Sequence, residues 1–383
     1  MPTLLVTNDF PPTVGGIQSY VRDYVAELVD RTGPDELVVF ASTQDADAAR
    51  AWDASCDYEV IRWPGTVMVP TPGVRAQMQR IIRERGINTV WFGAAAPLAL
   101  LGPAAREAGA SRVVATTHGH EVGWSMVPGA RSALRRIGNT SDVVTYISRY
   151  TLSRFGRAIG PHPRFVALPS AVDTRFFRPL PAERVAAVRA ELGVGEAPLV
   201  VCASRLVARK GQDQLIRALP GIRTRIDATR LVIVGSGPYE RRLRRLAERL
   251  NPADRAALTF TGAVGSEKLR DIIASADVFA MPARTRGWGL DTEGLGIVYL
   301  EAQACGVPVV GGTSGGAPEA VGPDSGVVVD GRDTQALVRE VAALLGDDAR
   351  RAEMGEAGPG FVEKHFGRRE LGDRLVRALH GEG

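Results

Sequence analysis

Short apolar runs alternate with amphipathic stretches along almost the whole of this 383-residue chain. The alternation is typical of repeated strand–helix units, in which helices cover both faces of a parallel sheet. We therefore expect an α/β fold. The strands expected in the first half are Thr3–Thr7, Glu36–Ser42, Tyr58–Trp63, Thr89–Phe92, Arg112–Thr117, Asp142–Ile147 and Arg164–Leu168. Those expected in the second half are Leu199–Ser204, Arg230–Val234, Leu258–Thr261, Asp277–Met281, Pro308–Gly311 and Gly326–Val329.

A proline-rich stretch that begins at Pro169, PSAVDTRFFRPLP, interrupts this pattern. We interpret it as a linker, so residues 1–169 and the residues from 170 onward are expected to form two doubly wound, Rossmann-like domains. Two such domains would face a central cleft at the carboxyl ends of their strands, because open α/β sheets bind ligands there.

The composition fits a chain of the cytoplasm. No apolar run reaches the ~18 residues that a transmembrane helix needs. The nearest, Trp91–Ala105, has no charge but contains two prolines, and we expect a buried strand and helix there. The start, MPTLLVTNDF, lacks the basic segment of a signal peptide. Three distant cysteines, Cys56, Cys202 and Cys305, argue against a disulfide framework or a zinc site.

Charge is unevenly distributed along the chain. Residues 1–60 hold eleven acids against three arginines, whereas residues 61–170 hold fourteen arginines against four acids. A basic surface of this kind either is simply solvated or meets an anionic membrane or substrate. No aromatic-interleaved basic motif is present, so nucleic acid is not expected as a partner.

A basic helix is expected at residues 74–85, with Val74, Met78, Ile81 and Ile82 on its apolar side. This side either packs on the sheet or attaches to a membrane surface. Arg131, Arg135 and Arg136 would extend the same basic face.

Several polar residues follow expected strands of the first half. Gly15 and Gly16 lie between the first strand and a helix expected at Ile17–Arg31, where backbone N–H groups favour an anion, although an ordinary turn would look the same. His118 comes just past another strand, where it could orient a sugar hydroxyl or a reacting group. The spacing of His118, His120 and Glu121 does not match a metal site, so no metal is expected.

The second half carries two cations after its first strand, in CASRLVARKGQ. Arg205 ends the strand and Lys210 enters the next helix, so both are well placed to neutralise a diphosphate, unless they are merely exposed charges. Only three of the 47 basic residues are lysines, which draws attention to Lys210. The turn VGSGPYE lacks the third glycine of a nicotinamide-binding fingerprint and is expected to support the adjacent site.

The segment TEGLGIVYLE holds two acids, Glu293 and Glu301, in apolar surroundings. A helix expected at Leu295–Ala304 would place Glu293 at its N-terminus and Glu301 two turns in. Eight helical residues span ~12 Å, which is near the distance from a sugar across two phosphates to a ribose. Carboxylates accept paired hydrogen bonds from vicinal hydroxyls, and the N–H groups between them can meet phosphate.

With these motifs the chain resembles the retaining glycosyltransferases of family 4, which have the GT-B fold. The resemblance rests on NDFPP with GGIQ, THGHE, PSAVD, SRLVARKGQ, VGSGPY and E-GLGIVYL-E, and covers nearly the whole chain. Within this family the chain most resembles the actinobacterial GDP-mannose-dependent phosphatidylinositol mannoside mannosyltransferases, in the runs TNDFPP with GGIQSY, WFGAAAPLALL and THGHEVGWSM. The resemblance implies a second domain at 170–365 that holds the nucleotide sugar. It also implies a C-terminal helix, 366–383, that returns to the first, acceptor-side domain.

The resemblance also implies a role for each matching residue. Arg205 and Lys210 would bind the diphosphate and stabilise the leaving group without a metal; Glu293 would contact the donor sugar and Glu301 the ribose. His118 would hold the transferred sugar, and Asp9 would support the acceptor side. The backbones expected to contact the donor are Gly16, Val264, Gly294, Leu295, Gly296 and Ile297.

The implied activity is retaining transfer of mannose from GDP-mannose to a phosphatidylinositol mannoside, with an α-1,6 linkage, at the cytoplasmic face of the membrane. No cofactor is expected. Alternatives are a UDP-sugar donor, a soluble acceptor such as an inositol phosphate or an aglycone, a non-catalytic nucleotide-sugar-binding protein, and an oxidoreductase. Trp288 departs from the family pattern, either as a packing detail or as a change at the acceptor. The oligomeric state is left open.

Overall fold

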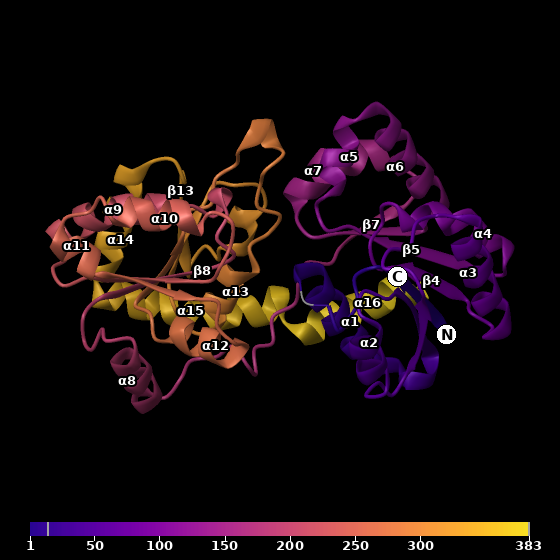
Figure 1. The fold of residues 1–383 in the computed structure, drawn as a ribbon, viewed down its shortest axis with the longest axis horizontal. Helices are drawn as coiled ribbons and strands as arrows, with labels where there is room; N and C mark the ends of the chain where they lie inside the picture. Colours follow the sequence, from indigo (N-terminus) through magenta and orange to yellow (C-terminus); the bar gives the residue numbers. More distant parts are fainter. Residues whose placement is uncertain (14, 382–383) are drawn as a thin grey trace. The chain divides into compact units, whose positions relative to one another are not determined.

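The computed structural model describes residues 1–13 and 15–381, and its contacts divide the chain into two compact units (Figure 1). The first comprises Met1–Ala171 together with the C-terminal segment from Arg368, and the second comprises Val172–Gly367. Both boundaries fall two residues later than the sequence suggested. The two boundaries lie side by side in space, because Val172 and Gly367 form a parallel β-bridge. Residues 382–383, the last two of the expected C-terminal helix, lie outside the described residues.

The first unit contains a seven-stranded parallel sheet in the order β3-β2-β1-β4-β5-β6-β7. Its strands confirm the seven predicted ones to within one residue at each end. They are β1 (Thr3–Thr7), β2 (Leu37–Ser42), β3 (Glu59–Trp63), β4 (Thr89–Phe92), β5 (Arg112–Thr116), β6 (Val143–Tyr146) and β7 (Arg164–Ala167).

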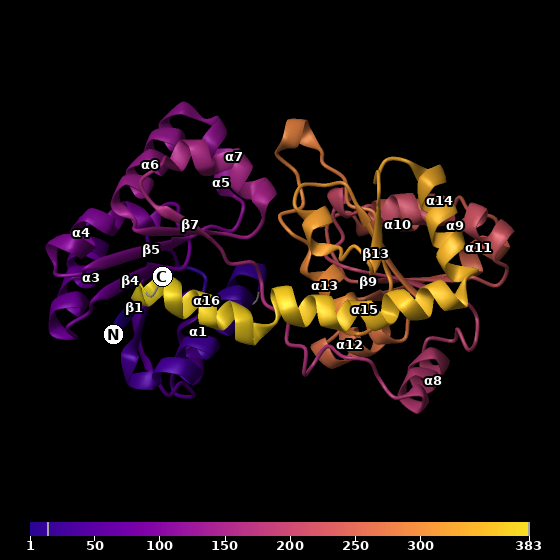
Figure 2. The same cartoon turned by 180° about the vertical axis from the view of Figure 1, so that it is seen from behind.

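Helices cover both faces of this sheet. The bounds are α1 (Gly16–Thr32), α2 (Ala46–Asp53), α3 (Pro72–Glu84), α4 (Gly102–Glu107), α5 (Glu121–Met126), α6 (Pro128–Thr140), α7 (Arg149–Ile159) and α16 (Arg368–His380). In both ribbon views α16, in yellow, runs beside α1, in indigo (Figure 1, Figure 2). Leu371 and Leu375 of α16 are fully buried in the same core as Tyr24 of α1 and Trp91 of β4, so the C-terminal helix completes the first unit.

The basic helix α3 packs on the opposite face of this sheet. All four of its apolar residues, Val74, Met78, Ile81 and Ile82, are at most 2% exposed and belong to one core cluster. The alternative that this apolar side attaches to a membrane surface was therefore wrong, because the side already packs on the sheet.

The second unit repeats the plan with a six-stranded parallel sheet in the order β10-β9-β8-β11-β12-β13. The strands again fall where they were predicted, to within one residue. They are β8 (Leu199–Ala203), β9 (Arg230–Val234), β10 (Leu258–Gly262), β11 (Val278–Met281), β12 (Val309–Gly312) and β13 (Gly326–Val329). The helices are α8 (Ala182–Glu191), α9 (Gln212–Arg225), α10 (Glu240–Ala247), α11 (Pro252–Ala256), α12 (Ser266–Ala274), α13 (Ile297–Ala304), α14 (Thr334–Leu345) and α15 (Asp348–Phe366).

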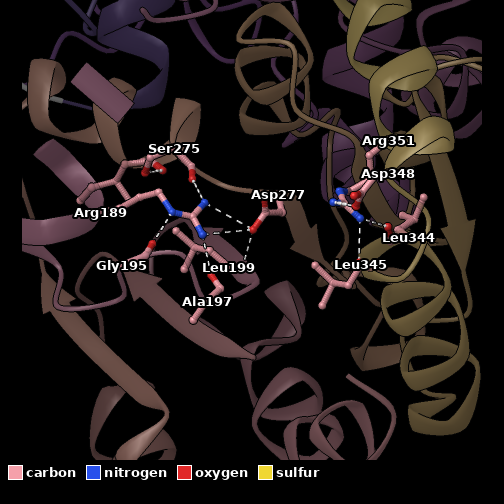
Figure 3. Close-up of polar contacts among 11 residues, drawn as sticks. Arg189, Gly195, Ala197, Leu199, Ser275, Asp277, Leu344, Leu345, Asp348 and Arg351 are labelled. Carbon is pink, nitrogen blue, oxygen red and sulfur yellow. Dashed lines mark hydrogen bonds and ion pairs between the residues drawn. The ribbon is translucent and has the colours of Figure 1, made fainter. Parts of the chain in front are cut away.

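Two arginine side chains donate to backbone carbonyls at the ends of helices and strands of this unit (Figure 3). Arg189 of α8 donates to the carbonyls of Gly195 at 2.7 Å, Ala197 at 2.5 Å and Ser275 at 2.9 Å, so one guanidinium holds the approach to β8 against the end of α12. Arg351 donates to the last carbonyls of α14, which have no partner within their own helix.

In each sheet the order of the strands reverses beside the first strand of the unit. The reversal lies between β1 and β4 in the first unit and between β8 and β11 in the second. Loops that leave neighbouring strands in opposite directions open a crevice at such a point, and ligands of doubly wound sheets bind there. The two reversal points therefore determine where candidate site residues should lie.

Among the described residues, no helix has both the length and the apolar character needed to cross a membrane.

Candidate active site

A buried ion pair lies at the reversal point of the second unit. The ammonium group of Lys210, which ends a short 3-10 helix (Ala208–Lys210) after β8, is 2.7 Å from Oε2 of Glu293. The two side chains are only 11% and 9% exposed. Gly211, with φ 81°, turns the chain from Lys210 into α9, where a Cβ would lie 2.1 Å from the carbonyl oxygen of Pro282. The sequence predicted both residues, and the structure brings them together.

The main chain of Glu293 is held by the loop that follows β12. Its N–H donates to Oγ of Ser314 at 3.1 Å, and its carbonyl accepts from the N–H of Gly316 at 3.0 Å. Between these two contacts Gly315, with φ 57°, passes so close that a Cβ would lie 2.1 Å from the carbonyl oxygen of Glu293. The position of this carboxylate is therefore set by loops after both β8 and β12.

The helix after Glu293 begins later than predicted. α13 starts at Ile297, so Glu293, Gly294, Leu295 and Gly296 form a loop before it, whereas the sequence suggested a helix from Leu295. The cause is Gly296, whose φ of 90° is left-handed and interrupts the helix, and a Cβ there would lie 2.6 Å from the ring of Tyr299. The N–H groups that begin α13 thus come four residues after Glu293.

Glu301 lies in the middle of α13. Burial raises the pKa of its carboxyl to about 7, and the Lys210 ammonium opposes this rise. Its Oε2 atom is buried and forms no hydrogen bond within the described part of the chain. A buried acceptor without a partner costs free energy, which the hydroxyl groups of a ligand would recover.

Sequence reasoning missed Arg209 and Asp291. Nη1 of Arg209 is 3.3 Å from Oδ1 of Asp291, and its Nε is 3.7 Å from Oε2 of Glu293. Arg209 thus places a second cation beside the Glu293 carboxylate. Arginine is so common in this chain that a single one attracts no attention, although its place next to Lys210 was a usable signal.

Arg205 lies on the same loop but is exposed, and no ion pair of its guanidinium is found among the described residues. The VGSG turn supports this loop, as predicted, because the N–H of Leu206 donates to the carbonyl of Ser236 at 2.9 Å. Gly235 approaches so closely that a Cβ would lie 2.1 Å from the carbonyl oxygen of Ser204. Val264 is half-buried in the loop after β10, where it packs against the core of this unit.

The first unit has its own polar cluster at the ends of β1, β4 and β5. His118 lies 2.7 Å, through Nε2, from the carbonyl oxygen of Gly93. A carbonyl can only accept, so Nε2 carries the proton and Nδ1 can accept from a ligand. Burial lowers the pKa of His118 to about 4, which keeps the imidazole neutral near pH 7.

Glu121 fixes the backbone around this histidine. Its buried carboxylate accepts from the N–H of His118 at 3.2 Å and of Gly119 at 3.0 Å, and its other oxygen is 3.3 Å from Nε2 of His120. These contacts account for the buried acid of THGHE. Within the described residues, no group of three or more histidine, cysteine or acidic side chains could hold a metal ion.

Asp9 and Gly16 lie beside the same cluster. Burial raises the pKa of Asp9, and the nearby His120 opposes the rise. One Asp9 oxygen accepts from the Gln18 amide at 2.8 Å. Gly16 is the first residue of α1, and a Cβ there would meet nothing within 4 Å, so there is free space beside the start of this helix.

Two family models match adjacent parts of the chain. Residues 14–176 match the model described as Glycosyltransferase Family 4, and residues 186–361 match the one described as Glycosyl transferases group 1.

Two of the relatives are similar over nearly their full length. The chain is 55% identical, over 99% of its own length and 98% of the relative's, to the GDP-mannose-dependent monoacylated alpha-(1-6)-phosphatidylinositol monomannoside mannosyltransferase of Corynebacterium glutamicum. It is 56% identical, with the same coverage, to the GDP-mannose-dependent alpha-(1-6)-phosphatidylinositol monomannoside mannosyltransferase of Mycolicibacterium smegmatis. The chain belongs to the family 4 glycosyltransferases and groups with these mannosyltransferases. It is therefore an enzyme of the hexosyltransferase class.

Solved structures confirm the GT-B fold. HepE from Anabaena, crystallised with UDP, matches with a TM-score of 0.80 at 19% identity, over 100% of both chains. Sucrose-phosphate synthase from Thermosynechococcus elongatus matches with a TM-score of 0.77 at 21% identity, again over 100% of both. The oxidoreductase and the non-catalytic alternatives are set aside by the identity to the two mannosyltransferases.

Proposed function

We propose that this glycosyltransferase moves mannose from GDP-mannose to a phosphatidylinositol monomannoside and forms an α-1,6 linkage with retention at the anomeric carbon. The observation that carries the proposal is the 55% identity over 99% of the chain to an enzyme named for this donor and acceptor. The buried, oppositely charged pair at the reversal point of the second sheet supplies the chemistry that a sugar diphosphate needs.

In this proposal the second unit binds the donor. Arg205 and Lys210 neutralise the diphosphate and the charge that develops on the departing GDP, without a metal. Glu293 accepts hydrogen bonds from the mannose hydroxyls, and Arg209 keeps its carboxylate in place. Glu301 accepts from the ribose hydroxyls. Donor phosphates meet the backbones of Gly294, Leu295, Gly296 and Ile297, and the base lies near Val264.

The first unit contributes the residues beside the transferred sugar and the acceptor. A neutral His118, which can accept at Nδ1, holds a mannose hydroxyl near the anomeric carbon. Asp9 supports the acceptor side, and the N–H of Gly16 meets the donor phosphate. The β-phosphate of the donor takes the proton of the acceptor hydroxyl on the same face from which GDP leaves, which gives retention.

The acceptor is a lipid, and we propose that the enzyme reaches it as a peripheral protein of the inner membrane face. Helices α6 and α7 of the first unit support this placement. Five exposed arginines of these helices have no acid within ion-pair distance in the described part of the chain; they are Arg131, Arg135, Arg136, Arg154 and Arg157. The single acid between residues 122 and 172, Asp142, is paired with Arg106 at 2.8 Å. Exposed Met126 and Val127 lie at the start of this face.

The activity can be tested with purified enzyme and radiolabelled sugar nucleotides. We expect mannose to pass from GDP-mannose to phosphatidylinositol monomannoside in vesicles, and Lys210→Met to slow transfer at least ~100-fold because one diphosphate charge is lost. Lys268→Met, on the surface of the same unit, is the control and should leave the transfer rate unchanged. Transfer from UDP-glucose instead, or only to inositol phosphate, would contradict the proposal.

The raised pKa of Glu301 predicts a pH dependence of donor affinity. Only the ionised carboxylate accepts from both ribose hydroxyls, and with a pKa of about 7 it is mostly ionised at pH 8 and mostly protonated at pH 6. The Kd of GDP-mannose, measured by calorimetry without acceptor, should therefore be about tenfold weaker at pH 6 than at pH 8. Glu301→Gln should bind weakly at both values. The same pH dependence in this variant would rule out Glu301 as its source.

The arginine face predicts salt-sensitive membrane binding. Each arginine near an anionic surface contributes about 1 kcal/mol, so replacing Arg131, Arg136 and Arg154 by Gln should weaken partitioning into phosphatidylinositol-containing vesicles by about two orders of magnitude at low salt. Replacing Arg241, Arg245 and Arg249 of the second unit by Gln is the matched control. Equal retention on neutral vesicles would contradict the electrostatic account.

A further inference from the structure

A short hairpin in the second unit carries an exposed tryptophan. Residues 286–291, here called the Trp288 finger, lie in the orange segment between β11 and α13 that extends from the body of this unit in both ribbon views (Figure 1, Figure 2). The N–H of Arg286 donates to the carbonyl of Asp291 at 2.8 Å, and the N–H of Asp291 returns the bond at 3.2 Å. Within the turn, the N–H of Leu290 donates to the carbonyl of Gly287 at 3.0 Å.

The tip of the finger presents apolar side chains to solvent. Trp288 is 98% exposed and Leu290 is 60% exposed. Trp288 also adopts a φ of 57°, a left-handed conformation that is uncommon for a bulky residue. Both the exposure of the apolar ring to water and the left-handed backbone are unfavourable in free energy. The ring makes no contact within its own unit that would offset this.

We propose that the Trp288 finger inserts into the lipid surface that carries the acceptor and anchors the second unit there. This inference rests on the proposed function only in taking the acceptor to be a membrane glycolipid. It assigns a membrane contact to the donor-binding unit, in addition to the arginine face of the first unit.

The dimensions of the tip favour a lipid surface over a protein partner. A tryptophan buries at most about 250 Å², so Trp288 and Leu290 together fall well short of the roughly 800 Å² per partner that a stable protein interface needs. A convex tip with one tryptophan can still enter the headgroup region of a bilayer, where tryptophan is enriched. Arg286 beside the tip is exposed, with its Nη1 3.7 Å from Oδ2 of Asp291, and adds a cation that an anionic headgroup can approach.

The base of the finger is fastened to the donor site. Asp291, which closes the hairpin, is 3.3 Å from Arg209, and Glu293 follows two residues later. On the other strand, Arg332 donates to the carbonyl of Thr285 at 2.7 Å and holds the hairpin on the body of the unit. A finger seated in lipid would thus hold the Glu293 loop at the surface where the acceptor is presented.

The test compares a lipid acceptor with a soluble one. Trp288→Asn removes the ring and suits the left-handed backbone, so the fold should be unaffected. We expect this variant to transfer mannose at least ~5-fold more slowly to phosphatidylinositol monomannoside in vesicles, but at the wild-type rate to the deacylated, water-soluble glycerophospho form. Val328→Asn, at another exposed apolar position of the same unit, is the control and should match wild type with both acceptors.

A direct measurement accompanies the kinetics. At 0.5 M salt, where the attraction of the arginine face is screened, vesicles that contain brominated lipid should quench part of the tryptophan fluorescence of the wild type. Trp288→Asn should lose that quenched component. An equal slowing with both acceptors, or unchanged quenching in the variant, would overturn the proposal. If the wild type transferred mannose to neither acceptor, the proposed function would fail instead.

Discussion

The candidate site of the second unit depends on the pairing of Lys210 with Glu293. A carboxylate and an ammonium taken out of water are tolerated only when each finds the other, and removal of one partner from such a pair costs about 3–5 kcal/mol. The local chain is built around this requirement. Gly211 lets the chain pass the Pro282 carbonyl to present Lys210, and Gly315 with Ser314 holds the main chain of Glu293. Arg209 adds a second positive charge on one side.

This pairing also defines what a donor must do when it binds. A sugar diphosphate brings two negative phosphates to Lys210 and hydroxyl groups to Glu293, so each partner can exchange part of its contact with the other for a contact with the ligand. Arg205, exposed and unpaired among the described side chains, can move to the diphosphate without breaking an ion pair. The Lys210–Glu293 pair is thus charge-balanced before a ligand arrives.

The strands and the domain plan could be predicted because buried parallel strands are short apolar runs that the sequence shows directly. The strand-end positions of Arg205, Lys210 and His118 followed from the same pattern. The start of α13 could not be predicted, because it depends on the left-handed conformation of Gly296 against the ring of Tyr299. The role of Arg209 was hidden since its contacts are to Asp291 and Glu293, more than 80 residues away. The basic helix α3 was ambiguous until its apolar residues were seen to face the sheet.

The central claim is that Glu293 recognises the donor sugar and is not merely the partner that stabilises Lys210. Calorimetric titration of Glu293→Gln with GDP-mannose and with GDP tests it directly. The account predicts that GDP-mannose binds at least ~10-fold more weakly to the variant, because a charged hydrogen-bond acceptor for mannose is lost, while GDP binds as tightly as before or more tightly, since Lys210 is released. Equal weakening of both ligands would show that Glu293 acts only on the scaffold and would contradict the account.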